Sequence, residues 1–316
     1  MQRTLVTGAA GFIGSHLCEA LLARGDTVVG LDNFDDFYSP AIKRANLSAA
    51  MRSDRFRLVE GDIRDAAAVD AAIGSGVDII VHLAARAGVR PSIEQPLLYQ
   101  DVNITGTGVL LEAARRHGIR KFIFASSSSV YGNSPKVPFS ETDNVDRPIS
   151  PYAASKKAGE LICHTYHHLF GIDITCLRFF TVYGPRQRPD LAIHKFARLI
   201  EAGQPIPVFG DGSMRRDYTY VGDIVAGVLA AMDRIGGYHI YNLGNSSPVS
   251  LAELIEALEK ALGKRAQIQR LPVQPGDVER TYADIETSRR ELGYAPATPL
   301  AEGLAAFVAW MRGGER

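Results

Sequence analysis

The chain has 316 residues, and its 35 basic and 35 acidic side chains give a formal net charge of zero at pH 7. This balance gives no electrostatic reason to expect binding to nucleic acid or to a membrane surface. No stretch approaches the roughly 20 apolar residues of a spanning helix, and the length predicts one large or two modest domains.

Short β-branched runs alternate with amphipathic stretches over the first half of the chain. The predicted strands are 4–7, 27–32, 56–60, 79–83, 121–125 and 174–179. The predicted helices lie near 12–24, 41–53, 65–73, 95–117 and 151–169. This alternation predicts an α/β protein with a doubly wound parallel Rossmann sheet, in which binding residues stand at the carboxyl ends of the strands.

The alternation ends after about residue 179, where proline and glycine become denser. We therefore expect a nucleotide-binding domain of residues 1–179, to which about 217–243 return. Residues 180–216 and 244–316 are expected to form a smaller α/β lobe. A cleft between the two parts would hold a second substrate.

A glycine-rich turn, Gly8-Ala9-Ala10-Gly11-Phe12-Ile13-Gly14, follows the first predicted strand. Glycines let backbone N–H groups approach a pyrophosphate, and the helix N-terminus favours its negative charge. Asp32 ends the next strand, about 20 residues further on, where a carboxylate accepts hydrogen bonds from an adenosine ribose and repels a 2′-phosphate. These features predict a dinucleotide site that takes NAD rather than NADP. The alternative to such a site is an ordinary glycine turn with a surface aspartate. The expected contacts here are Gly8, Gly11, Phe12, Ile13, Gly14, Asp32 and Asn33.

Tyr152 and Lys156 begin a predicted helix and share one face of it, because they are four residues apart. A cation beside a phenol lowers its pKa, so Tyr152 is a candidate base for a hydroxyl proton near neutral pH. Such a pair is common on helix surfaces. The serine run 126–129 follows the strand 121–125, however, and can present a hydroxyl to the same substrate oxygen.

With these motifs the chain resembles the extended short-chain dehydrogenase/reductase family along essentially its whole length. Further matching segments are 62–65, 82–85, Asn103, 126–132, 178–180 and 216–218. The resemblance implies that Asp62 and Ile63 bracket an adenine and that Ala84 lies along the dinucleotide. It also implies that Lys156 holds the nicotinamide ribose and that Ser127 is the partner of Tyr152. Further expected cofactor contacts are Leu83, Ala85 and Asn103.

The later segments are similar to those of nucleotide-sugar epimerases. The stretch 207–212, with Phe209, looks like their uracil-binding strand, and Arg216 matches the arginine that meets the UDP pyrophosphate. Asp277 matches the residue that binds the uridine ribose. Each of these also has a structural interpretation, as a turn, a solvated arginine or a helix-cap aspartate.

The segments 178–190 and 274–277 look like those of UDP-glucuronate 4-epimerases. Thr181 stands where UDP-glucose 4-epimerases usually carry Asn, and Ser129 stands where related decarboxylases typically carry Glu. Arg188, Thr181 and the serine run could supply donors for a uronate carboxylate, unless Arg188 is a surface charge. The expected substrate contacts are Ser127, Ser128, Ser129, Thr181, Arg188, Phe209, Arg216 and Asp277.

The reaction that this resemblance implies is NAD-dependent 4-epimerisation of UDP-glucuronate to UDP-galacturonate. It would pass through a transient 4-keto sugar without decarboxylation, and the NAD would stay bound. The alternatives are a UDP-glucose/UDP-galactose 4-epimerase, a nucleotide-sugar dehydratase and a non-catalytic NAD-binding protein. A dehydratase needs a further acid/base pair, commonly Asp-Glu, where Ser128 and Ser129 stand.

The resemblance further implies a homodimer through a four-helix bundle of the helices 95–117 and 151–169. The odd cysteine count predicts buried reduced thiols rather than disulfides, and the early first strand leaves no room for a signal peptide, so we expect a cytoplasmic protein. His164, His167 and His168 share one helix, but no carboxylate pattern stands nearby. We therefore expect no metal site there.

Overall fold

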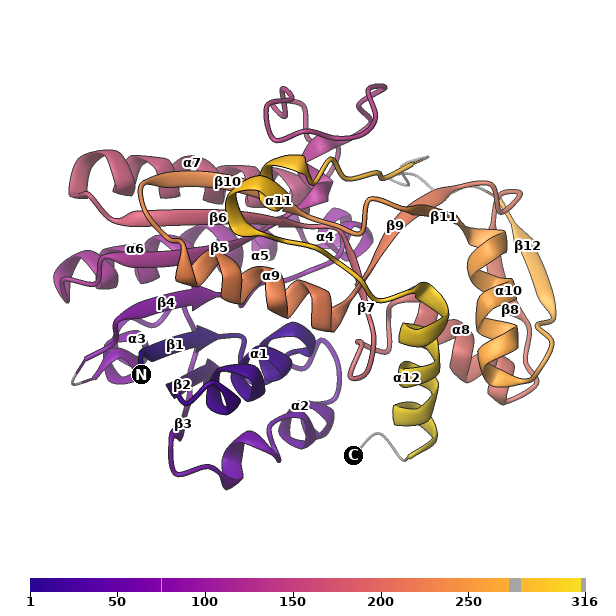
Figure 1. Cartoon of the computed structure of the whole chain (residues 1–316), viewed down its shortest axis with the longest axis horizontal. Helices are drawn as coiled ribbons and strands as arrows, with labels where there is room; N and C mark the ends of the chain where they lie inside the picture. The colour runs from indigo at the N-terminus through magenta and orange to yellow at the C-terminus, as the bar shows by residue number, and fades with distance from the viewer. Residues whose placement is uncertain (75, 273–279, 314–316) are drawn as a thin grey trace.

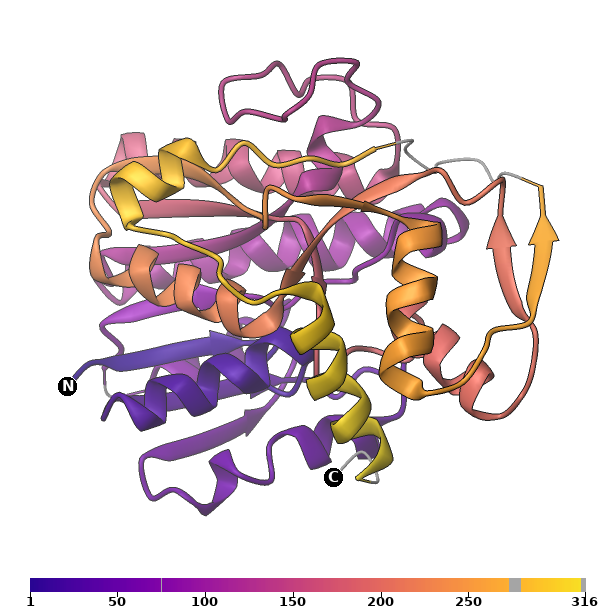
Figure 2. The same cartoon turned by 45° about the vertical axis from the view of Figure 1, so that its right-hand side comes forward.

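The computed structural model describes residues 1–74, 76–272 and 280–313. Two parts stand side by side in both ribbon views (Figures 1 and 2): a larger part built on one extended sheet, and a smaller part that contains α8, α10 and α12. Within the described ranges, no helix is both long and apolar enough to cross a membrane.

The larger part is built on seven parallel strands in the order β10-β6-β5-β4-β1-β2-β3, which confirms the predicted doubly wound sheet. The strands are β1 (Arg3–Thr7), β2 (Thr27–Asp32), β3 (Phe56–Glu60), β4 (Ile79–His82), β5 (Lys121–Ser127), β6 (Asp173–Phe179) and β10 (Tyr238–Leu243). The chain runs outward from β1 in one direction and from β4 in the other. A crevice is therefore expected at the carboxyl ends of β1 and β4.

Helices cover both faces of this sheet because its strands are apolar on both sides. Leu5 and Val6 are neighbours on β1, and since successive side chains point to opposite faces, they belong to two different core clusters. One cluster includes Leu17 of α1 and Ile224 of α9, and the other includes Leu110 of α6. The helices of this part are α1 (Phe12–Ala23), α2 (Pro40–Asn46), α3 (Ala66–Ile73), α4 (Val89–Glu94), α5 (Pro96–Gln100), α6 (Gly106–Arg116), α7 (Pro151–Phe170), α9 (Val221–Asp233) and α11 (Glu286–Leu292).

The predicted helix 95–117 is interrupted in the structure. It consists of α5, a π-helical turn over Asp101–Thr105, and α6, and the short α4 precedes it. The predicted helix 41–53 is likewise divided into α2 and a 3₁₀ turn, Ala50–Arg52. π-helical turns often occur at functional sites, and this one contains the buried Asn103.

The smaller part has its own apolar core between short sheets and three helices. Its strands are β7 (Thr181–Tyr183), β9 (Arg215–Tyr220) and β11 (Pro248–Ser250) in one sheet, and β8 (Ile206–Phe209) and β12 (Ile268–Leu271) in another. Its helices are α8 (Ala192–Glu201), α10 (Leu251–Leu262) and α12 (Leu300–Arg312). α10 begins with a capping box, in which Ser250 and Glu253 each bond the other's backbone N–H.

One segment lies away from the part to which the sequence assigned it. We expected 244–316 in the smaller lobe, but α11 packs on α9 and β10 (Figure 1). Ile285, Leu292 and Tyr294 are buried in a core of the main sheet. A helix this short has too few apolar positions for a pattern to identify its partner, so tertiary contacts decide its place.

Candidate active site

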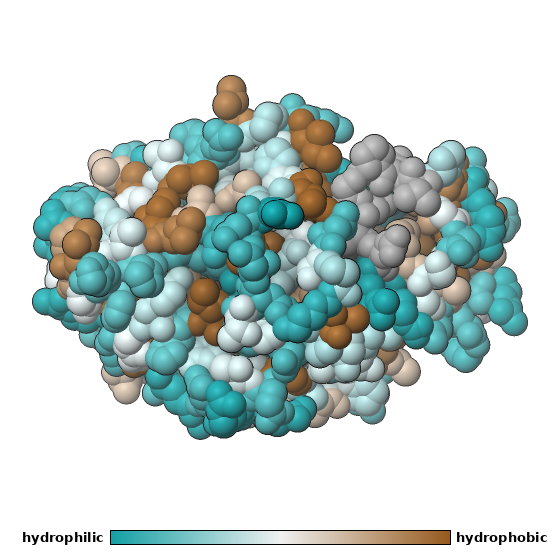
Figure 3. Space-filling view, turned by 90° about the horizontal axis from the view of Figure 1, so that it is seen from above, coloured by the Kyte–Doolittle hydropathy of each residue, from teal (hydrophilic) through white to brown (hydrophobic). Residues whose placement is uncertain are grey.

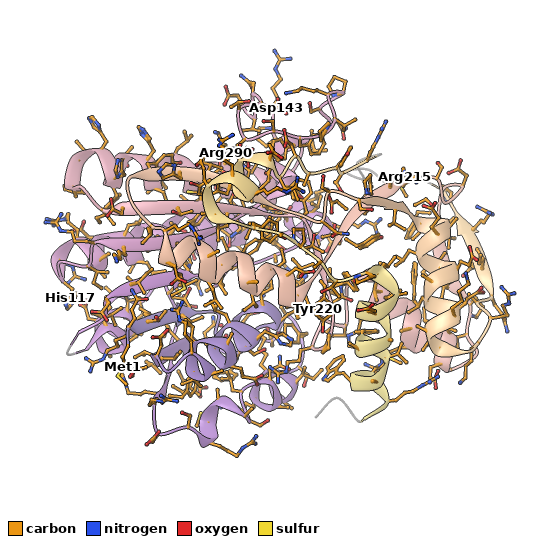
Figure 4. All side chains as sticks on the ribbon, in the orientation of Figure 1. Met1, His117, Asp143, Arg215, Tyr220 and Arg290 are labelled. Atoms are coloured by element: carbon orange, nitrogen blue, oxygen red, sulfur yellow. The ribbon has the colours of Figure 1, made fainter. Side chains whose placement is uncertain are left out.

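Two adjoining cavities lie between the carboxyl ends of the main strands and the smaller part. The first has a volume of about 490 Å³ and the second about 310 Å³, and Thr181 and Leu191 line both. Labelled residues in Figure 4 mark the two parts. His117 follows α6 at the end of the molecule where the main strands begin, and Arg215 stands on β9 in the opposite half. Tyr220 lies between the two parts.

Most of the predicted site residues line these cavities. In the first are Gly8, Gly11, Phe12, Ile13, Gly14, Asp32, Asn33, Asp62, Ile63, Leu83, Ala84, Ala85, Ser127, Ser128, Ser129, Tyr152, Lys156, Thr181 and Arg188. In the second are Thr181, Phe209 and Arg216. Asn103 lines neither cavity, and Asp277 lies outside the described residues. The structure thus gathers residues from distant segments, while the contacts that each makes with a bound molecule stay predictions.

The glycine turn is packed too tightly for any larger residue at two positions. Gly8 has a φ of 68°, and a Cβ there would lie 2.8 Å from the Ala84 nitrogen. A Cβ on Gly14 would lie 2.1 Å from the Gly8 oxygen. The first helix starts after Gly11 without any side-chain cap, so its N-terminal N–H groups are available to an anion in the cavity. The turn therefore fits a dinucleotide pyrophosphate.

Asp32 is fixed by the same turn. One carboxylate oxygen accepts a hydrogen bond from the Ala10 N–H and the other from the Phe34 N–H, both at 2.9 Å. Burial raises the pKa of Asp32. Each carboxylate oxygen has further acceptor capacity, so ribose hydroxyl groups can donate to it from the cavity.

Asn33 and Asp62 form a connected pair beside Asp32. The Asn33 Nδ2 donates to the Asp62 carboxylate at 2.9 Å. Hydrogen bonds from Arg64 are the main reason that the pKa of Asp62 falls to about 2. Asn33, Asp62 and Arg64 therefore form one hydrogen-bond network where we expect the adenine.

Tyr152 and Lys156 project from the first turns of α7. The Ser150 hydroxyl caps this helix by accepting from the Ala153 N–H at 3.1 Å, and Pro151 occupies its first position. Lys156 is 4% exposed, its ammonium donates to the Ala125 oxygen at 2.7 Å, and burial lowers the pKa of Lys156 to about 8. The pair thus begins the helix as the spacing predicts.

The pKa of Tyr152 differs from our expectation. Burial raises it, and a hydrogen bond with Ser127 and the positive charge of Arg188 oppose this rise only in part. We expected Lys156 to lower the pKa of the phenol, but its ammonium is bound to the Ala125 carbonyl. In this structure Ser127 and Arg188 stabilise the phenolate, and desolvation outweighs both.

A buried ion pair lies beneath the candidate catalytic residues. Arg178 and Glu160 are each 1% exposed, and Arg178 donates from Nε and Nη2 to the two Glu160 oxygens at 2.8 and 2.9 Å. Ser126 donates to Glu160 at 2.6 Å, and Arg178 Nη1 donates to the Tyr131 hydroxyl at 2.9 Å. Glu160 follows Lys156 by one helical turn on α7, and Ser126 precedes Ser127 on β5. The network therefore joins the helix that carries Lys156 to the strand that carries Ser127. Sequence reasoning missed Glu160, although its four-residue spacing from Lys156 was a usable signal.

Asn103 acts on the backbone of the site. Its Oδ1 accepts from the Arg86 N–H at 2.8 Å, and its Nδ2 donates to the Arg86 oxygen at 3.0 Å and to Ser155 Oγ at 2.9 Å. It therefore fixes the turn after β4, along which Ala84 and Ala85 line the cavity. The direct cofactor contact that we expect from Asn103 stays a prediction, and Asn103 lines neither cavity.

Several cavity residues were not predicted. They include Phe37, Tyr38, Lys43 and Arg86 in the first cavity, and Arg90, Asp190 and Tyr218 in the second. Arg90 lies over the Phe209 ring, 4.8 Å from its centroid. The aromatic run after β2 and the arginines after the 82–85 segment were possible signals. Within the described ranges, no cluster of three or more His, Cys, Asp or Glu residues could hold a metal ion.

Comparison with known proteins agrees with this arrangement. A profile of the NAD dependent epimerase/dehydratase family matches residues 4–244. A UDP-glucuronate 4-epimerase of Thermodesulfobacterium geofontis is 44% identical over 311 residues, which cover 98% of this chain and 95% of that protein.

Solved structures resemble the whole chain. The crystal structure of a UDP-glucuronic acid 4-epimerase from Bacillus cereus, in complex with UDP-glucuronic acid and NAD, has a TM-score of 0.92 and 39% identity, covering 98% of this chain and 99% of that one. A UDP-glucose 4-epimerase of Thermotoga maritima, with UDP-glucose, also has a TM-score of 0.92, with 32% identity and coverage of 99% and 100%. This chain belongs to the NAD dependent epimerase/dehydratase family.

Proposed function

We propose that this protein is an NAD-dependent UDP-glucuronate 4-epimerase that forms UDP-galacturonate. One observation carries the proposal: the candidate base Tyr152 lines the same cavity as Thr181 and Arg188. A uronic acid brings a carboxylate beside the reacting carbon, and arginine is the side chain best suited to bind one. The similarity to UDP-glucuronate 4-epimerases supports the same substrate.

The cofactor would lie along the carboxyl ends of β1, β2 and β4. In this arrangement the glycine turn binds the pyrophosphate, Asp32 the adenosine ribose, Asp62 and Ile63 the adenine, and Lys156 the nicotinamide ribose. When bound, NAD accepts a hydride from C4 of the sugar and later returns it. Because it is regenerated in each cycle, it has no need to leave.

Tyr152 takes the proton of the sugar C4 hydroxyl and returns it when the hydride returns to the opposite face. Ser127 donates a hydrogen bond to the same oxygen. The 4-keto sugar turns over between the two steps while its pyrophosphate stays bound. Tyr152 is active as a base only when deprotonated, so groups that stabilise its phenolate promote the reaction.

The carboxylate needs particular control, because a 4-keto uronic acid is a β-keto acid. Loss of CO₂ requires the C5–carboxylate bond to align with the carbonyl π system. Arg188, Thr181, Ser128 and Ser129 would hold the carboxylate charged and out of that alignment. Burial of a carboxylate without such partners is costly.

The UDP part would occupy the second cavity. Phe209 would face the uracil and Arg216 the pyrophosphate, and Arg90 offers a further cation beside Phe209. The ribose contact from Asp277 stays a prediction. In this proposal the larger part, residues 1–179 with about 217–243, binds NAD, and most of the remaining chain binds the nucleotide sugar.

The proposed homodimer would bury apolar residues that one copy leaves exposed. Leu97, Leu161 and Leu169 are 76%, 56% and 66% exposed, and they belong to α5 and α7, which the resemblance places in a four-helix bundle. On the face seen in Figure 3, hydrophobic residues form separate patches among hydrophilic ones. Introducing charge with Leu161→Glu is expected to yield monomers in analytical ultracentrifugation, and an unchanged dimer would exclude this interface. A cytoplasmic location stays a prediction.

The nearest alternative is UDP-glucose/UDP-galactose 4-epimerisation, since a UDP-glucose 4-epimerase resembles the fold equally well. Chromatography of products after incubation of the purified protein with each sugar, without added NAD, tests both. We expect UDP-galacturonate from UDP-glucuronate. Mainly UDP-pentose, or turnover of UDP-glucose alone, would overturn the proposal.

A further inference from the structure

Arg188 is held in the cavity wall by two residues that have no assigned role. Its guanidinium lies over the ring of Phe37, 5.2 Å from the ring centroid. It also donates to both oxygens of Asp190, from Nε at 3.0 Å and from Nη2 at 2.7 Å. With 16% of its side chain exposed, Arg188 is a partly buried cation with a defined orientation.

The Phe37 ring is itself firmly supported. Phe37 belongs to the loop after β2 that begins with Asn33, and its N–H donates to the Asp35 carboxylate at 2.9 Å. Asp35 forms an ion pair with Arg86, whose guanidinium lies 4.9 Å from the centroid of the same ring. Two arginines from separate segments thus pack on one aromatic side chain, and the loop that is expected to bind the adenosine ribose also supports Arg188.

Asp190 holds Arg188 from the side of the second cavity. Asp190 lines that cavity, whereas Arg188 lines the first. An arginine has five N–H donors, and Asp190 uses the Nε and Nη2 edge. Arg188 Nη1 has no hydrogen-bond partner among the residues that the structure describes. The second edge of the fork is therefore open to another carboxylate.

We propose that Phe37 and Asp190 are positioning residues that present the open edge of Arg188 to the sugar carboxylate and thereby set the preference for a uronic acid. This inference rests on the proposed function. Without either support the guanidinium samples more rotamers, and ordering it on binding costs conformational entropy. A neutral sugar does not need this group, so its binding is unaffected.

Steady-state kinetics of the purified enzyme with its bound NAD test the inference. The measured quantities are the KM for UDP-glucuronate, the inhibition constants of UDP-glucose and UDP, and the NAD content per chain. With Phe37→Leu and Asp190→Ala we expect the KM to rise about tenfold. The two inhibition constants and the NAD content should stay unchanged. Phe37→Tyr keeps the aromatic face and should retain the wild-type KM.

Phe170→Leu is the matched control, because Arg115 lies over that ring at 5.3 Å, far from the cavities. It should leave the KM unchanged. A Phe37→Leu enzyme with a wild-type KM for UDP-glucuronate would overturn the inference. So would one in which the inhibition constant of UDP-glucose rises as much as that KM. If the wild-type enzyme did not convert UDP-glucuronate at all, the proposed function would fail instead.

Discussion

The two cavities differ in how the protein holds the residues that line them. In the first, buried polar groups are fixed by the main sheet and the turns at its strand ends: Asp32 by two backbone N–H groups, and Lys156 by the Ala125 carbonyl. In the second, Phe209 and Arg216 stand half-buried on short strands above an apolar core. In the proposed reaction, proton transfer relies on a preorganised frame, and substrate choice relies on loops and strand ends between the two parts.

This difference implies that variants of the two regions should affect different measured quantities. Changes in the frame should reduce turnover or stability for every substrate. Changes at the junction should alter the affinity for particular parts of the nucleotide sugar. The following variants test that division, from the largest expected effect to the smallest.

Tyr152→Phe should reduce kcat by about 10² to 10⁴-fold, because the proposed base is lost. The NAD content after purification should not change, because the ring remains. Tyr166→Phe, on the same helix with its hydroxyl at a surface glutamate, is the control and should retain full activity. Wild-type turnover by Tyr152→Phe would remove this residue from the mechanism.

Glu160→Gln should lower the free energy of unfolding by about 3–5 kcal/mol, because it leaves the charge of Arg178 buried and uncompensated. Urea denaturation followed by circular dichroism measures this change. The double variant with Arg178→Met should recover part of the loss. Glu112→Gln, which breaks an exposed pair with Arg115, should leave the urea midpoint of unfolding nearly unchanged. An equal loss of stability in Glu160→Gln and Glu112→Gln would contradict the contrast between the buried network and the solvated surface.

Arg188→Met and Arg216→Met separate the two cavities directly. Arg188→Met should weaken UDP-glucuronate binding by about 1.5–3 kcal/mol, the value of hydrogen bonds to a charged group, and leave UDP binding unchanged. Arg216→Met should weaken UDP-glucuronate, UDP-glucose and UDP alike. Isothermal titration with the three ligands measures these effects, and identical profiles for the two variants would refute the separate roles.

Ser127→Ala should move the pH profile of kcat/KM. The hydrogen bond from Ser127 lowers the pKa of Tyr152, so its removal raises that pKa further. Because Tyr152 acts when deprotonated, the acidic limb should shift to higher pH, by up to about one unit. Activity at neutral pH should fall accordingly. A shift toward lower pH would contradict the assignment.

The sequence predicted those features that local pattern determines. β-Branched runs marked the strands of the main sheet, and the glycine turn had to be tight because a Cβ on Gly8 or Gly14 would collide with backbone. The spacing of Tyr152 and Lys156 predicted a shared helix face. Arg188 was predicted as a substrate contact, and it lines the first cavity. These features lie within single elements or at strand ends, where the topology alone brings them together.

The remaining features depend on tertiary contacts that no pattern expresses. The partner of Lys156 is a carbonyl on β5, and desolvation decides the direction of the Tyr152 pKa shift. Phe37 reaches Arg188 from a segment far away in sequence, whereas Asp190 is only two residues from it. The placement of α11 on β10, and the role of Asn103 in holding the Arg86 turn, likewise follow only from the folded chain.

The most direct test of the account uses UDP-glucuronate with deuterium at C4, incubated in ordinary water without added NAD. The product is analysed by mass spectrometry and NMR. Because the account has the same hydride leave C4 and return to it, UDP-galacturonate should retain the deuterium at C4. Product that carries solvent hydrogen at that carbon, or no product without added NAD, would contradict the account.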